Sequence, residues 1–159
     1  MTSMPLERSY ADAERVTASW ARSFYFASRF VPLAKRRAIF ALYDYCRYAD
    51  NRVDLRGDRP VSEVRHQLAL LGATVRALHA GAEAEHPRWL ALGDTLRRHA
   101  VPLQPLLELL EGVATDLGPV EMRTFAELER YSYQVAGVVG LMLGPVLGAE
   151  RRGFDAHGV

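Results

Sequence analysis

The chain has 159 residues, of which 25% are charged and 49% hydrophobic, and its formal net charge is +1. This composition indicates one globular domain, and the absence of a basic run argues against a dedicated nucleic-acid-binding protein. Cys46 is the only cysteine, so an internal disulfide is excluded and a reduced, cytoplasmic setting is expected. The N-terminus lacks the apolar core of a signal peptide, and the longest apolar run, from Val135 to Leu147, is too short to span a bilayer. At most a peripheral membrane contact is expected.

Prolines and polar loops divide the chain into a series of helical patterns, and strand signals are almost absent. We predict helices over residues 6–20, 33–54, from 60 to beyond 78, 88–99, 102–115 and 124–147, with a short helical or turn segment at 22–30. Thr124 and Glu127 have the spacing of a capping box, which marks the start of the last helix. The pattern predicts an all-α helical bundle.

The helix expected over 33–54 carries a polar stripe on an otherwise apolar sequence. Tyr43, Arg47, Asp50 and Asp54 follow one another at three- and four-residue steps and therefore share one helix face. Carboxylates one turn apart can hold Mg²⁺, which prefers oxygen ligands and usually keeps waters and phosphates in its other positions. The Arg47 guanidinium can pair with the same phosphates. The alternative is an ordinary ion pair between Arg47 and Asp50, with Asp54 capping or solvating the helix end.

The last helix is the second informative stretch. Tyr131, Val135 and Val139 stack at four-residue steps, with Ala136 and Gly140 beside them. Small residues at these positions leave room either for a neighbouring helix or for a ligand. Glycine inside a helix costs roughly 1 kcal/mol relative to alanine, so several glycines imply a packing or cavity reason.

Several motifs, taken together, resemble the squalene/phytoene synthase family over residues 15–148. They are Ser23-Phe24-Tyr25, Arg36-Arg37-Ala38, Leu42-Tyr43-x-Tyr-Cys46-Arg47-Tyr-Ala-Asp50-x-x-x-Asp54, Asp116-Leu117, and Tyr131-Ser-Tyr-Gln-Val135-Ala136-Gly137-Val-Val139-Gly140. The resemblance implies the N-terminal half of an all-α isoprenoid synthase fold. It also implies head-to-head condensation of two prenyl diphosphates, geranylgeranyl or farnesyl diphosphate, with Mg²⁺ as cofactor and a phytoene- or squalene-type product.

The resemblance also assigns roles to individual residues. It implies that Asp50 and Asp54 form the first aspartate-rich metal motif, that Tyr131 is the active-site tyrosine near the carbocation, and that Arg47 and Ser23 contact diphosphate. Tyr43 and Phe24 would line the same pocket. The wall of the prenyl-chain tunnel would comprise Val135, Ala136, Val139 and Gly140. Asp116 is assigned to support of the fold, and Trp20 and Trp89 to packing.

The chain also departs from the family pattern. Asn51 replaces a residue that is often acidic, and a second aspartate-rich motif, expected on a later helix, is absent. We therefore interpret residues 1–159 as a single, incomplete domain. It would act with a companion chain or by self-association, or it would be a non-catalytic relic that binds a prenyl diphosphate or a protein. A third class, an all-α Mg²⁺-dependent nucleotide pyrophosphatase, would have to rely on Glu108 and Glu111.

Overall fold

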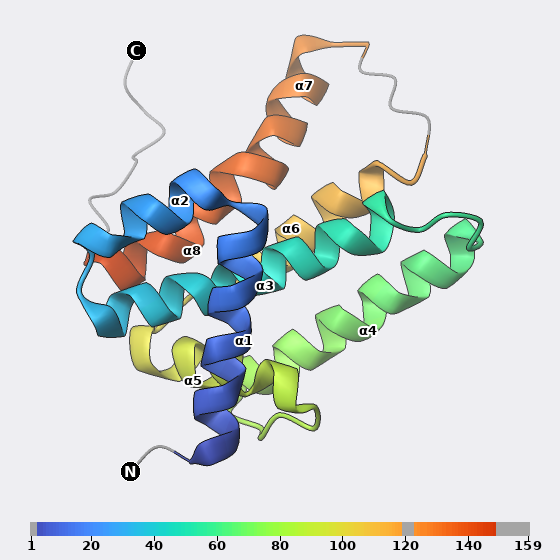
Figure 1. Cartoon of the computed structure of the whole chain (residues 1–159). Coiled ribbons are helices and arrows are strands. Elements are labelled where there is room, and N and C mark those ends of the chain that lie inside the picture. Colours follow the sequence, from blue (N-terminus) through green and yellow to red (C-terminus); the bar gives the residue numbers. More distant parts are fainter. Residues whose placement is uncertain (1–2, 119–122, 149–159) are drawn as a thin grey trace.

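A computed structural model describes residues 3–118 and 123–148, and within these ranges the regular elements are all helical (Figure 1). In chain order they are α1 (Met4–Trp20), α2 (Arg22–Ala27), the 3₁₀ turn η1 (Ser28–Phe30), α3 (Leu33–Asp54), α4 (Val61–His79), the 3₁₀ turn η2 (Pro87–Trp89), α5 (Leu90–His99), α6 (Leu103–Thr115), α7 (Phe125–Ser132), the π-helical turn η3 (Tyr133–Gly137) and α8 (Val138–Leu147). The predicted all-α bundle is confirmed. No helix in the described ranges is long and apolar enough to cross a bilayer.

Helix α3 runs through the middle of the bundle and packs against α1, α4, α5, α6 and α8 (Figure 1). It begins and ends where the sequence predicts, directly after Pro32, whose ring favours a helix start. Ala38, Leu42 and Ala49 face the core and are almost completely buried. Tyr45 is fully buried, and its hydroxyl donates a hydrogen bond of 2.6 Å to the carbonyl oxygen of Leu106 in α6. This bond satisfies the only polar atom of the side chain inside the core.

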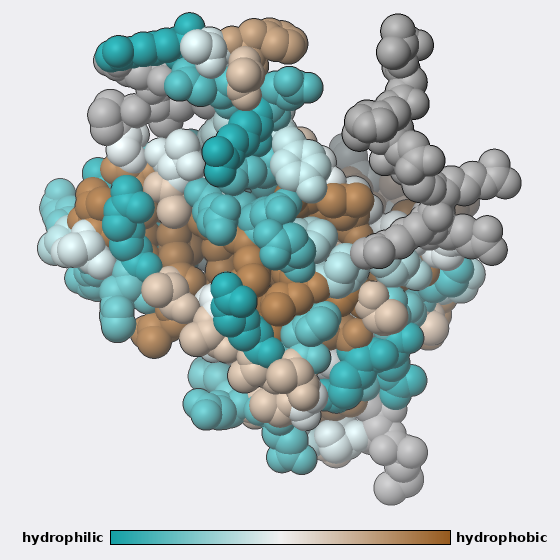
Figure 2. All heavy atoms as spheres, turned by 180° about the vertical axis from the view of Figure 1, so that it is seen from behind, coloured by the Kyte–Doolittle hydropathy of each residue, from teal (hydrophilic) through white to brown (hydrophobic). Residues whose placement is uncertain are grey.

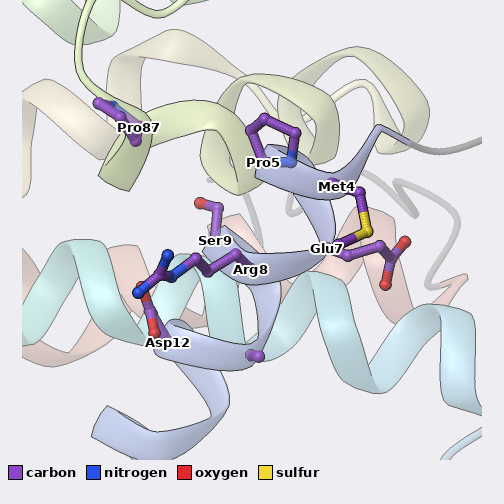
Figure 3. Close-up of a pocket in the computed structure, with 8 residues that line it drawn as sticks. Met4, Pro5, Glu7, Arg8, Ser9, Asp12 and Pro87 are labelled. Carbon is purple, nitrogen blue, oxygen red and sulfur yellow. The ribbon is translucent and has the colours of Figure 1, made fainter.

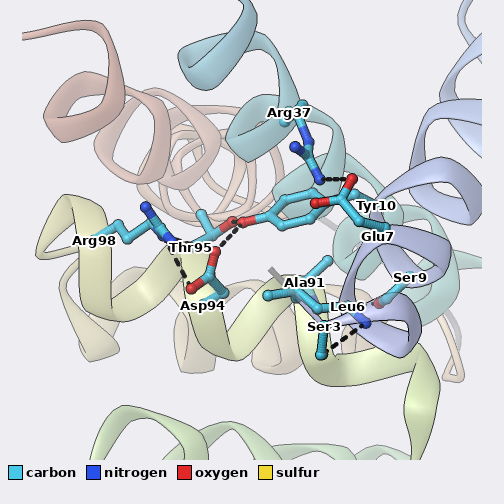
Figure 4. A network of polar contacts seen from close by, with 10 residues as sticks. All are labelled: Ser3, Leu6, Glu7, Ser9, Tyr10, Arg37, Ala91, Asp94, Thr95 and Arg98. Carbon is cyan, nitrogen blue, oxygen red and sulfur yellow. Dashed lines mark hydrogen bonds and ion pairs between the residues drawn. The ribbon is translucent and has the colours of Figure 1, made fainter. Parts of the chain in front are cut away.

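A buried polar network joins α1 to α5 (Figure 4). The Tyr10 hydroxyl donates to Asp94 Oδ2 at 2.7 Å, and Arg98 Nε donates to the same carboxylate oxygen at 2.8 Å. The Arg37 guanidinium lies 4.2 Å from the centroid of the Tyr10 ring. Burial raises the pKa of Tyr10 to about 12, so the phenol stays a donor at physiological pH. The network fixes α1 against the bundle on the side that carries α5.

The last helix differs from the uninterrupted α-helix predicted over 124–147. Its start is confirmed, because Thr124 Oγ1 accepts from the backbone N–H of Glu127 at 3.2 Å and the Glu127 carboxylate accepts from the N–H of Thr124 at 3.0 Å. One turn later the helix widens into η3. Gly112 of α6 lies against this turn so closely that a Cβ there would be 2.8 Å from the Cβ of Gln134. Such π turns are often found at functional sites.

The two tryptophans have different environments. Trp89 is buried and packs edge-on against Tyr48 at a centroid distance of 5.0 Å, as the sequence predicts. Trp20 is half-exposed at the end of α1, so it packs at the surface and not in the core. Its ring instead lies 4.5 Å from the guanidinium carbon of Arg47, beside the polar stripe.

Candidate active site

The polar stripe of α3 is held in place by Arg47. Its Nη2 donates to Asp54 Oδ2 at 2.9 Å, its Nε donates to Asn51 Oδ1 at 3.0 Å, and the face of its guanidinium covers the Trp20 ring. The nearest Asp50 oxygen is 4.0 Å away, at the outer limit of an ion pair. The close ion pair therefore involves Asp54, and not Asp50 as in the alternative drawn from the sequence. Asp50 is left directed toward a neighbouring cavity.

This cavity has a volume of about 170 Å³ and lies between α2, α3, α6 and α8. Phe24, Tyr43, Asp50 and Val139 are among its lining residues, so four residues predicted for one site meet here. The rings of Phe24 and Tyr43 stack with centroids 5.7 Å apart. The remaining lining residues are apolar or sulfur-containing: Ile39, Leu42, Cys46, Leu109, Met142 and Leu143. The site is an apolar pocket with one carboxylate at its margin.

The electrostatic environment of Asp50 favours a cation. Burial is the largest cause of a raised pKa of this carboxyl group, and the negative charges of Asp54 and Asp116 raise it further, while Arg47 opposes the shift. The carboxylates of Asp54 and Asp116 therefore lie within electrostatic range of Asp50, the one carboxylate that lines the pocket. A divalent cation would relieve their repulsion. In the described part of the chain no three His, Cys, Asp or Glu side chains form a ready metal cage. An ion at this place would need water or phosphate to complete its shell.

Asp116, which the sequence analysis assigns to support of the fold, also contacts a residue predicted for the site. It follows the last residue of α6, and its carboxylate accepts the Tyr131 hydroxyl of α7 at 3.0 Å and 3.3 Å. Burial, this hydrogen bond and the charge of Asp116 raise the pKa of Tyr131. The assignment of Asp116 to support of the fold is therefore incomplete, because the residue also orients the phenol proposed as catalytic.

Replacing Asp116 by asparagine should lower the pKa of both Tyr131 and Asp50. The substitution removes a negative charge that disfavours the ionised form of each group. Nuclear magnetic resonance titration of ¹³C-labelled tyrosine and aspartate measures both shifts. Asp58→Asn, in an exposed loop, is the matched control and should leave both pKa values unchanged. An unchanged pKa of Tyr131 in Asp116→Asn would contradict the hydrogen bond.

Other predicted residues lie outside the cavity. Ser23 is exposed on α2 and does not line it, and Ala136 and Gly140 are exposed on the last helix. A Cβ added at Gly140 would meet no described atom within 4 Å. The side chain of Val135 lies outside the described residues. Among the four residues predicted for a tunnel wall, Val139 is the one that lines the cavity within the described part of the chain.

A larger groove of about 910 Å³ lies elsewhere, along the outer side of α1 near η2 (Figure 3). Met4, Arg8, Asp12 and Pro87 line it, and the polar stripe of α3 contributes no residue. Although this groove is larger, it is not the candidate active site, because it contains none of the residues of the polar stripe. The smaller pocket combines an apolar enclosure with convergent polar groups, which is the usual composition of a ligand site.

The bundle and its pocket define a class of protein: an all-α fold whose central helix carries a polar stripe beside an apolar cavity and presents one aspartate, Asp50, to that cavity. The chain belongs to the squalene/phytoene synthase family, whose model matches residues 18–158. It is 38% identical over 145 residues to the 15-cis-phytoene synthase of Synechococcus elongatus, covering 91% of this chain and 46% of that protein. It is likewise 38% identical over 137 residues to the phytoene synthase of Thermus thermophilus, covering 86% and 45%.

Solved structures agree with this assignment. A squalene synthase from Alicyclobacillus acidocaldarius superposes with a TM-score of 0.81 at 26% identity, over 94% of this chain and 55% of that one. A dehydrosqualene synthase solved with a ligand gives a TM-score of 0.79 at 28% identity, over 89% and 48%. The chain thus spans about half the length of these relatives. The family assignment leaves the nucleotide pyrophosphatase alternative without support.

Proposed function

We propose that this chain forms the first half of a head-to-head prenyl synthase that joins two prenyl diphosphates into a phytoene- or squalene-type hydrocarbon. The observation that carries the proposal is the meeting of Phe24, Tyr43, Asp50 and Val139 around one apolar cavity. An apolar wall suits a prenyl chain, and the carboxylate at its margin suits a metal-bound diphosphate. The names of the relatives agree with this substrate class.

We propose Asp50 and Asp54 as the residues that hold Mg²⁺. When bound, the ion would neutralise the charge of the departing diphosphate and so assist cleavage of the carbon–oxygen bond. Asp54 is bonded to Arg47, and therefore the same arginine lies beside the metal-bearing carboxylates and can pair with diphosphate oxygens. The Trp20 ring restrains the guanidinium from its other face. The Arg47 guanidinium would thus be oriented before the substrate binds.

Three further features act on the carbon skeleton in this proposal: the stacked aromatic rings, the apolar lining and Tyr131. The stacked rings of Phe24 and Tyr43 line the cavity, and an aromatic face can stabilise an allylic cation placed over it. The apolar residues around them exclude the water that would otherwise capture the cation. Tyr131, held by Asp116, keeps its proton because its pKa is raised. Its neutral phenol would then lie near the carbocation, as the family resemblance implies.

The second half of the fold is part of the proposal. Exposed apolar side chains occur along α7, η3 and α8: Phe125, Leu128, Tyr133 and Leu141. Apolar residues also cross the middle of the face turned away from the view of Figure 1 (Figure 2). We propose that the part of the fold present in the longer relatives covers this surface. It would lie on the same polypeptide or on a companion chain, and it would supply the second aspartate-rich motif.

The test is turnover of geranylgeranyl or farnesyl diphosphate with Mg²⁺, followed as diphosphate release and extractable hydrocarbon. We expect release when residues 1–159 are combined with the second half of the fold, and none when chelator removes the metal. Arg47→Ala should abolish release, whereas Arg65→Ala on the exposed side of α4 should not. Failure of the combined halves to release diphosphate, with substrate binding intact, would support the non-catalytic alternative.

A further inference from the structure

The segment formed by α2 and η1 has two unlike sides. Phe24 faces the cavity and stacks on Tyr43, and the Tyr25 hydroxyl donates to Glu14 of α1 at 2.9 Å. On the outer side, Phe26 is 60% exposed and Phe30 is 84% exposed, and their rings meet edge to face at 6.4 Å. Leu33, 64% exposed, continues this surface at the start of α3. Phe26, Phe30 and Leu33 are called the outer apolar tip below.

The segment that carries the outer apolar tip has charged side chains of one sign. The chain as a whole has a net charge of only +1, but residues 21–43 contain no aspartate or glutamate. They contain five basic side chains: Arg22, Arg29, Lys35, Arg36 and Arg37. Arg37 is paired with Glu7 at 2.8 Å. Arg29 is exposed, with its guanidinium carbon 5.6 Å from the centroid of the Phe26 ring. Exposed apolar side chains, with the Arg29 guanidinium packed beside one of them, therefore project from a positively charged segment.

We infer that the outer apolar tip docks the protein on an anionic phospholipid bilayer. Apolar side chains enter the boundary between headgroups and acyl chains, and arginine or lysine at the same level pairs with lipid phosphate. A second copy of the chain is disfavoured as the occupant, because a two-fold contact would set two clusters of like charge against each other. Binding itself does not depend on the proposed function. If that function holds, docking brings the cavity beside Phe24 close to the bilayer, where long-chain substrates and hydrocarbon products partition.

The experiment is sedimentation of the full polypeptide with vesicles, in the absence of any prenyl diphosphate. We expect binding to phosphatidylcholine vesicles containing about one third phosphatidylglycerol, much weaker binding to phosphatidylcholine alone, and loss of binding in high salt. Phe26→Ser with Phe30→Ser should lower the partition coefficient more than about tenfold, because two exposed rings no longer insert. Arg29→Gln should lower it about fivefold.

Matched controls lie on α4 and the loop before it, away from α2 (Figure 1). Leu55→Ser with Leu70→Ser removes two apolar side chains that are 61% and 55% exposed, and Arg65→Gln removes one exposed cation. Both should bind vesicles like the unaltered protein. Equal binding to neutral vesicles, equal loss in the controls, or no vesicle binding at all would each overturn the inference. So would a dimer that the Phe26→Ser and Phe30→Ser variant dissolves, since a second copy would then cover the tip.

Discussion

Asp50→Asn is expected to weaken Mg²⁺-dependent binding of farnesyl or geranylgeranyl diphosphate by more than about 100-fold, beyond the range seen when only a supporting group of a metal site is lost. Asparagine keeps the shape of the side chain and removes the charge that would hold the ion. Titration calorimetry with and without Mg²⁺ measures the effect. Because the pKa of Asp50 is raised, Mg²⁺ affinity of the unaltered protein should increase as the pH rises through that pKa. The variant should lack this dependence.

The same substitution should leave the fold intact. In the folded protein, burial raises the pKa of Asp50, so its contribution to stability is present at low pH and is lost as the pH rises through the raised value. At neutral pH the variant should therefore unfold at the same urea concentration as the unaltered protein or a higher one. Asp58→Asn serves as the control for removal of one negative charge. Marked destabilisation by Asp50→Asn would instead favour a structural ion pair with Arg47.

The sequence predicts α3 well because its signals are local. Pro32 precedes the helix, the apolar residues repeat with helical period, and Asp50 and Asp54 must then share a face wherever the helix packs. The hydrogen bond between Tyr131 and Asp116 could not be predicted in this way. It joins residues 15 positions apart across a loop, and no periodicity connects them.

The π turn shows a second limit. Four-residue spacing predicts one stack through Tyr131, Val135 and Val139, but η3 inserts a wider turn between the first and the last of these residues. The feature that accompanies this turn is a contact with another helix, the close approach of Gly112 in α6 to Gln134. The residue spacing within one helix cannot predict a contact with a second helix. The family resemblance rests on the order of motifs along the whole chain. It therefore identifies these residues, but it does not predict which of them share a helix face.

Gly112→Ala and Gly140→Ala should therefore change stability in opposite directions. Both replace a helical glycine, and alanine favours a helix by about 1 kcal/mol at either position. At Gly140 the new methyl group meets no described atom within 4 Å, so the gain is realised. At Gly112 it would lie 2.8 Å from Gln134 Cβ and 3.2 Å from the Gln134 carbonyl, and backbone atoms cannot turn away as a side chain can. We expect a net loss of about 1–3 kcal/mol in the free energy of unfolding, measured by urea denaturation.

Gly112→Ala should also weaken the hydrogen bond between Asp116 and Tyr131 in the candidate site. Gly112 is one turn before Asp116 on the same helix, and Gln134 is one turn beyond Tyr131, so separating the two segments lengthens the bond between the Asp116 carboxylate and the Tyr131 hydroxyl. The pKa of Tyr131 should then fall, because that hydrogen bond is one cause of its elevation. Gly140→Ala should leave the titration unchanged. If Gly112→Ala lost stability while Tyr131 titrated normally, the close approach would serve packing alone, and the π turn would not position the tyrosine.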